Sequence, residues 1–160
     1  LAGLLDDCGA LLRGTAPQTD PLVAVVAVDE AARQAGMAHS SVLSVRLLDQ
    51  NAAGRTRRVA VLQACAAGGR SVLQAVMVAP RGLPPEPAEV CDLLAAECRR
   101  LSAVPDLKDQ RPAPQDRPGL VQQVTDLLEH ATDQGVPVPL SRRLLRLTDA
   151  LALLTPRGRG

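Results

Sequence analysis

The fold of this chain depends on one stretch, residues 55–79, which reads RTRRVAVLQACAAGGRSVLQAVMVA. The runs on both sides of AAGG are short, apolar and rich in valine, a pattern typical of β-strands. Two adjacent glycines between such runs indicate a tight turn. The preceding run, SVLSVRLLD at 41–49, has the same character and is separated from the stretch by QNAAG. Residues 41–80 therefore predict a three-stranded antiparallel meander.

Pairing these strands across loops at 50–54 and 66–70 sorts their side chains onto two faces, because side chains alternate along a strand. The face that would form the core collects Leu43, Val45, Leu47, Val59, Val61, Leu73, Ala75 and Met77. The other face supplies a candidate protein-interaction surface, made of Arg46, Arg58, Leu62, Val72, Gln74 and Val76. Arg46 and Arg58 would be cross-strand neighbours. Like charges in that position indicate either a solvated strand end or an acidic partner or phosphate held between them.

Helical patterns flank the predicted sheet. Apolar residues recur at three- and four-residue spacing in four segments, 3–13, 86–102, 118–134 and 141–154. The run LVAVVAV at 22–28 fits either a fourth strand that turns into a short helix, or one helix with Asp20 and Pro21 at its start. Its valines favour the strand. We therefore expect an α+β fold, with a three- or four-stranded antiparallel meander flanked by an N-terminal helix and C-terminal helices.

A change of composition divides the chain. The run VPDLKDQRPAPQDRP at 104–118 is rich in proline and balanced in charge, which is typical of a linker. We expect residues 1–103 to form the α+β domain. Residues 119–160 would then form a helical hairpin that packs on this domain or on a partner.

The composition excludes several classes of binding site. The chain has no Phe, Trp or Tyr, so its core must consist of Leu, Val and Ala, and it has no aromatic platform on which nucleic-acid bases could stack. A net charge of +1 gives no general attraction to nucleic acid or to membranes. The sequence contains no run of eighteen apolar residues, so it predicts no membrane-spanning helix. We expect neither a nucleic-acid nor a membrane partner.

No catalytic or metal-binding motif is present. The four cysteines, Cys8, Cys65, Cys91 and Cys98, lack CxxC spacing and are interpreted as reduced core residues of an intracellular protein. The two histidines, His39 and His130, are interpreted as surface residues, although a nucleophilic pair of Cys65 with His39 stays open, since catalytic partners need not be adjacent in sequence. We expect no metal and no cofactor.

These observations favour a non-enzymatic protein–protein interaction module, a subunit or adaptor of a larger intracellular assembly. Its partner would be another protein or a second copy of the chain, because apolar surface is left over on the sheet and on the terminal helices. The alternative is a small-ligand-sensing or enzymatic domain with a pocket between sheet and helices.

Overall fold

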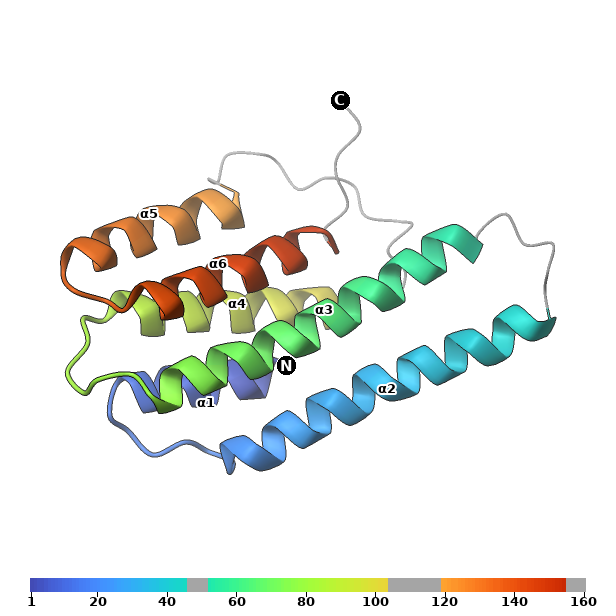
Figure 1. Cartoon of the computed structure of the whole chain (residues 1–160), viewed down its shortest axis with the longest axis horizontal. Helices are drawn as coiled ribbons and strands as arrows, with labels where there is room; N and C mark the ends of the chain where they lie inside the picture. Colours follow the sequence, from blue (N-terminus) through green and yellow to red (C-terminus); the bar gives the residue numbers. More distant parts are fainter. Residues whose placement is uncertain (46–51, 104–118, 155–160) are drawn as a thin grey trace.

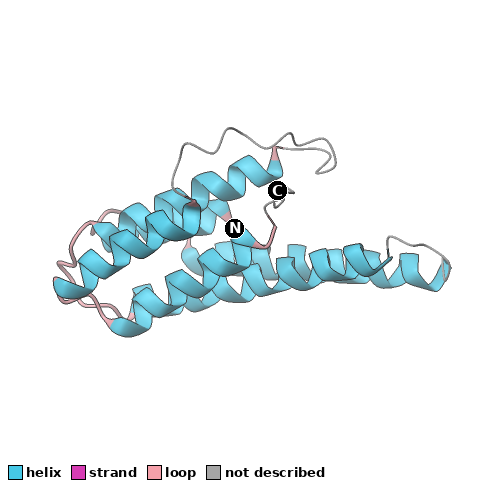
Figure 2. Cartoon of the chain, turned by 90° about the horizontal axis from the view of Figure 1, so that it is seen from above, coloured by secondary structure: helices cyan, strands magenta, loops and turns pink. Residues whose placement is uncertain are grey.

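The protein is a bundle of helices. A computed structural model describes residues 1–45, 52–103 and 119–154 of the 160-residue chain, and within these ranges it contains six helices and no strand (Figure 2). The helices are α1 (Ala2–Leu12), α2 (Pro21–Val45), α3 (Ala52–Met77), α4 (Glu86–Ser102), α5 (Leu120–Asp133) and α6 (Val138–Ala152). The predicted α+β fold is therefore wrong, and the chain is all-helical over the described residues.

The predicted meander at 41–80 is replaced by the end of α2 and the whole of α3. Three residues of α3, Cys65, Val72 and Val76, are spaced seven and four apart, so they share one side of a helix, and all three are buried. The strand-like alternation extends over only the few residues of VAVLQA. The segment is also rich in Ala, Leu, Gln and Arg, which are strong helix formers. The eight residues expected to share a core face do not all do so: Val61, Leu73 and Ala75 are buried, whereas Met77 is 63% exposed.

The AAGG segment is a helix interior and not a turn. A Cβ at Gly68 would lie 3.1 Å from Cδ1 of Leu147 on α6, and a Cβ at Gly69 would lie 2.5 Å from Cδ1 of Leu1, next to α1. Glycine at these two positions lets α6 and α1 approach the backbone of α3 closely. The glycines therefore mark a crossing of three helices.

The ambiguous run at 22–28 belongs to α2, so the helical alternative is right and the predicted fourth strand is wrong. The carboxylate of Asp20 accepts a hydrogen bond from the backbone N–H of Leu22 at 2.9 Å, and Pro21 is the first helical residue. The helices predicted at 3–13, 86–102, 118–134 and 141–154 are confirmed as α1, α4, α5 and α6. The predicted linker at 104–118 lies outside the described residues.

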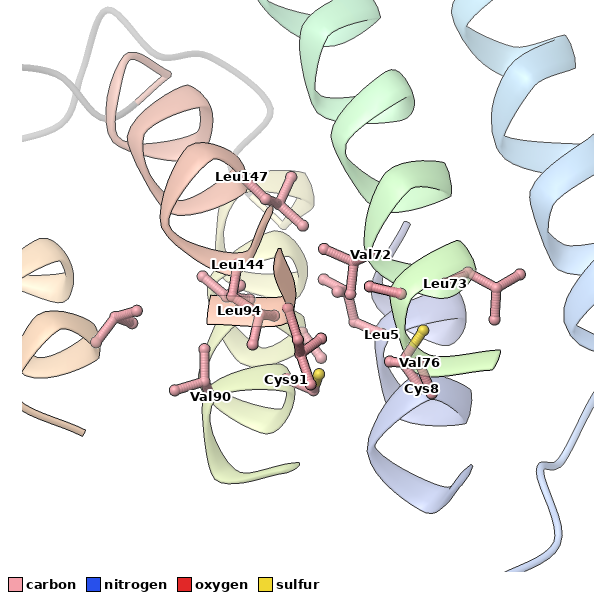
Figure 3. Packing of buried hydrophobic residues seen from close by; sticks show 14 of the residues in the cluster. Leu5, Cys8, Val72, Leu73, Val76, Val90, Cys91, Leu94, Leu144 and Leu147 are labelled. Carbon is pink, nitrogen blue, oxygen red and sulfur yellow. The ribbon is translucent and has the colours of Figure 1, made fainter. Parts of the chain in front are cut away.

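The helices pack around a core made by α1, α3, α4 and α6 (Figure 1). Helix α2 packs on α3 and α1 at one side, and α5 packs on α4 and α6 at the other. Helices α1 and α4 are antiparallel and joined by two ion pairs, Arg13 with Asp92 and Arg99 with Asp6. Leucine, valine, alanine and cysteine side chains fill the space between the helices (Figure 3), as the absence of aromatic residues predicted.

Helices α2 and α3 are much longer than their neighbours. With 25 and 26 residues they each span about 38 Å, against about 22 Å for the 15 residues of α6. Their far ends extend together beyond the other helices (Figures 1 and 2). Among the side chains that the structure describes, the core reaches to Val28 on α2 and to Val61 on α3. We call the remaining parts, residues 29–45 and 52–60, the arm.

Candidate interaction surfaces

The predicted interaction residues lie on α3, except for Arg46, which is outside the described residues. Four residues share one side of the helix, Arg58, Leu62, Val72 and Val76. Leu62, Val72 and Val76 follow Arg58 by four, fourteen and eighteen residues, which are about one, four and five helical turns. Gln74 lies on the opposite side and is exposed. The structure thus brings four of the six residues onto one stripe, although a strand was the reason for grouping them.

Burial divides this stripe into two parts. Val72 is fully buried and Val76 is 8% exposed, whereas Leu62 is 43% exposed and Arg58 is exposed. Helix α1 packs on α3, and Leu1 and Leu4 lie beside Gly69. This contact covers the C-terminal part of the stripe and leaves its N-terminal part, near the arm, uncovered. Val72 and Val76 therefore belong to the core of this chain, and Leu62 and Arg58 face outward.

Three of the most exposed apolar side chains lie together at the start of α2, where the sequence predicted no site. Leu22 is 68% exposed, Val23 58% and Val26 67%, and together they form what we call the outer face of α2. Val25 and Val28 point the other way and pack against the core. The run LVAVVAV carries apolar residues all round the helix, and this was the signal that could have revealed the face.

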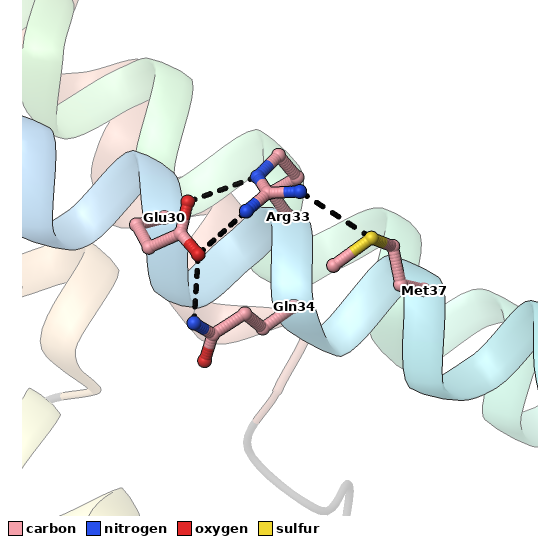
Figure 4. Close-up of polar contacts among 4 residues, drawn as sticks. All are labelled: Glu30, Arg33, Gln34 and Met37. Carbon is pink, nitrogen blue, oxygen red and sulfur yellow. Dashed lines mark hydrogen bonds and ion pairs between the residues drawn. The ribbon is translucent and has the colours of Figure 1, made fainter.

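Further along α2 the surface becomes polar. The Glu30 carboxylate accepts hydrogen bonds from Nε of Arg33 at 2.9 Å and from Nε2 of Gln34 at 2.7 Å (Figure 4). Arg33 also contacts the Met37 sulfur at 3.3 Å. These hydrogen bonds hold the pKa of Glu30 below its usual value, the one from Arg33 contributing most. An ion pair of 3.2 Å between Asp29 and Arg70 joins α2 to α3 at the base of the arm.

The arm carries an unusual concentration of positive charge. Helix α3 contains no acidic residue, and its first two turns carry Arg55, Arg57 and Arg58. Arg57 and Arg58 are exposed and form no ion pair with any residue that the structure describes. No acidic residue of α3 offsets these arginines.

The other half of the molecule carries unpaired negative charge. Asp126, Glu129 and Asp133 are spaced three and four residues apart on the exposed side of α5, and we call them the acidic ridge. Helix α5 contains no Lys or Arg. The ridge separates two grooves, one of about 780 Å³ between α4 and α5 and one of about 430 Å³ between α5 and α6.

The two grooves differ in their polar lining. Glu89, Asp126 and His130 line the α4–α5 groove around an apolar floor. The α5–α6 groove is lined by Glu129, Asp133 and Ser141, with four further residues, Thr125, Leu128, Thr132 and Leu145. Its distinctive atom is Oγ of Ser141, which is buried and has no hydrogen-bond partner. An unpartnered buried hydroxyl is unfavourable.

A third hollow, of about 780 Å³, lies between the end of α1 and the loop at 79–85. Gly14 and Gly82 form the turns that shape it, with φ of 72° and 79°. Its charged lining residues are Arg13, which is paired with Asp92, and Arg81, which is exposed. No His, Cys, Asp or Glu lines this hollow, so it presents no general base and no thiol.

The cysteines are poor nucleophiles. All four are free thiols; Cys8, Cys65 and Cys91 are buried, as expected, and Cys98 is half-buried. Burial raises the pKa of Cys8 to about 12 and that of Cys65 to about 11. The Cys65 thiol is therefore protonated at neutral pH, which disfavours the possible pairing with His39. His39 lies on α2, but its side chain is outside the described residues.

His130 is exposed on α5, with Nε2 lying 2.7 Å from Nε2 of Gln134 and 3.6 Å from Oε1 of Glu86. Over the described residues no three His, Cys, Asp or Glu side chains gather as a metal site would require. His130 and Glu86 thus form a polar contact between α5 and α4.

One helix, Thr56–Met77, is long and apolar enough to cross a membrane by length and composition, with a mean hydropathy of 1.3. Core helices of globular proteins pass the same test, and 44% of this window is buried inside the bundle. The chain matches no protein-family model, no curated protein and no solved structure.

Proposed function

We propose that this protein is a non-enzymatic interaction module that binds another protein chain through the outer face of α2, as a subunit or adaptor of a larger assembly. The observation that carries the proposal is the exposure of Leu22, Val23 and Val26 side by side on one face. Exposed apolar side chains that gather in this way are typical of interaction sites.

The outer face of α2 supplies part of the free energy that a specific contact requires. Burying one Leu or Val side chain contributes about 1.5–3 kcal/mol, so three of them contribute several kcal/mol towards the cost of association. The face lies on the outside of the bundle, because α2 packs on α3 and α1 with its other side. A partner can therefore cover it without any change in the core.

Site-specific photo-crosslinking tests this proposal. A photoreactive residue at Val26 should form adducts with a defined protein in cells that make this protein. The matched control is Asp149 on α6, which is exposed but lies outside the outer face of α2. Adducts at Val26 should disappear when Leu22→Glu is added, while the circular dichroism spectrum stays the same. Equal crosslinking at both positions, or none at either, contradicts the proposal.

A second candidate function is small-ligand binding in the hollow beside α1. Its volume of about 780 Å³ is within the usual range for ligand pockets, and Arg81 gives it a free positive charge. An anionic ligand would raise the melting temperature of the protein, and Arg81→Ala would abolish the increase. The lining lacks acid–base groups, so binding is favoured over catalysis here.

A further inference from the structure

We infer that copies of this chain associate head to tail, with Arg57 and Arg58 on the arm of one copy bound to the acidic ridge and the α5–α6 groove of the next. This inference goes beyond the proposed function, because it involves neither the outer face of α2 nor its partner. It rests on charges that no described residue of the same chain neutralises.

Each of the two surfaces carries charge that its own helix does not offset. Arg57 and Arg58 follow the first turn of α3, and this helix contains no acidic residue. Glu129 and Asp133 lie in the last turns of α5, where the helix dipole favours positive charge. Glu129 also follows Asp126 by three residues and precedes Asp133 by four, so like charges repel along the ridge. Pairing the two surfaces offsets the charge on both.

The two surfaces cannot meet within one molecule. Helices α3 and α5 do not pack on each other in the described part of the chain. The start of α3 lies at one end of the long axis of the molecule, and the end of α5 lies at the other (Figure 1). A second copy, which carries the complementary surface by necessity, is the occupant that the charges favour.

The α5–α6 groove offers what a guanidinium group requires. Glu129 and Asp133 line it, and neither forms an ion pair with a described residue. Ser141, which is 7% exposed and has a buried Oγ without a hydrogen-bond partner, belongs to the same lining. Arginine presents five N–H donors, enough for both carboxylates. One arginine of the arm fits here, while its neighbour faces Asp126 on the ridge.

The contact is heterologous, because a surface on one copy meets a different surface on the next. Such contacts form rings when the rotation closes and open chains when it does not. The assembly should depend on salt, since its attraction is between exposed charges that are screened over about 10 Å at 0.1 M and about 3 Å at 1 M ionic strength.

A charge-swap experiment on the full chain tests the inference. By sedimentation velocity at about 0.1 M salt, the wild-type mass should grow with protein concentration and fall to that of a monomer at about 1 M salt. The double variants Arg57→Glu/Arg58→Glu and Glu129→Arg/Asp133→Arg should each be monomeric alone. An equimolar mixture of the two should associate again, because each acidic surface then meets a basic one.

Controls keep the outcomes distinct. Arg81→Glu reverses an exposed arginine elsewhere and should leave the association unchanged, and circular dichroism should show the same helix content in every variant. Leu22→Glu, on the outer face of α2, should also leave the self-association unchanged. A failure of the proposed function can therefore be distinguished from a failure of this inference. A wild-type chain that is monomeric at all concentrations overturns the inference. A second outcome also overturns it: the mixture stays monomeric, and Arg57→Glu/Arg58→Glu abolishes binding of the protein to RNA or to vesicles of anionic lipid.

Discussion

Replacing Gly68 by leucine tests whether α3 is one continuous helix pressed against α6. In an open helix position, changing Gly to Leu stabilises by about 0.8 kcal/mol, because glycine is the poorer helix former. At Gly68 even a Cβ would lie 3.1 Å from Cδ1, 3.5 Å from Cβ and 3.7 Å from Cα of Leu147, a fully buried residue. Adding three more carbon atoms there forces the helices apart, and overpacking of this kind costs about 1–3 kcal/mol.

We expect Gly68→Leu to lower the free energy of unfolding by up to about 2 kcal/mol, the overpacking cost less the gain in helix propensity. Gly68→Ala should be nearly neutral, because its propensity gain of about 1 kcal/mol offsets the small shift required of Leu147. The control is Gly3→Leu on α1, where a Cβ would meet no atom within 4 Å. This variant should be neutral or more stable than the wild type.

Urea unfolding followed by circular dichroism at 222 nm measures all three variants. A net loss of 2 kcal/mol corresponds to a fall of about 4–8 °C in melting temperature for a chain of this size. If Gly68→Leu is as stable as Gly3→Leu, then α6 does not press on α3 at this point. The helical account of AAGG would then be refuted.

Other predictions concern burial, thiols and ion pairs. Val72→Asp should unfold the protein, since an unpaired charge in a fully buried position costs several kcal/mol, whereas Leu62→Asp should keep the native helix content by circular dichroism. Cys8 and Cys65 should react with a thiol reagent at pH 8 only after unfolding. Burial holds their pKa at about 12 and about 11, above the unfolded value of 9.0, so the unfolded state loses protons first and urea stability should fall as the pH rises from 9 towards 12. Asp92→Asn breaks a half-exposed ion pair between α1 and α4 and should lower the free energy of unfolding by less than about 1 kcal/mol in the same titration.

The candidate surfaces were only partly visible in the sequence. Arg58 and Leu62 were selected as strand neighbours, and they share a surface because four residues make about one helical turn. Val72 and Val76 were selected with them, but α1 covers that part of α3, and no local pattern tells which part of a stripe another helix will cover. The acidic ridge was missed because its three carboxylates look like an ordinary solvated helix face until the orphaned hydroxyl of Ser141 is seen beside them.

The sequence by itself determined four helices and the chemical nature of the core. Helices α1, α4, α5 and α6 have clear three- and four-residue apolar spacing, which is a local property. The lack of aromatic residues restricted the core to small aliphatic side chains and thiols. Both conclusions depend on residues close together in the chain or on composition alone.

The identity of α2 and α3 depends on contacts with distant helices. Their valine-rich runs fit a strand or a helix equally over six or seven residues, and the Gly68–Gly69 pair fits a turn or a close helix crossing. Leu147 and Leu1, which press on those glycines, lie nearly 70 or more residues away in the chain. The choice is made by burial against these distant helices, because the helical form buries Cys65, Val72 and Val76 on one side together, and a short window of sequence contains none of the helices that cover them.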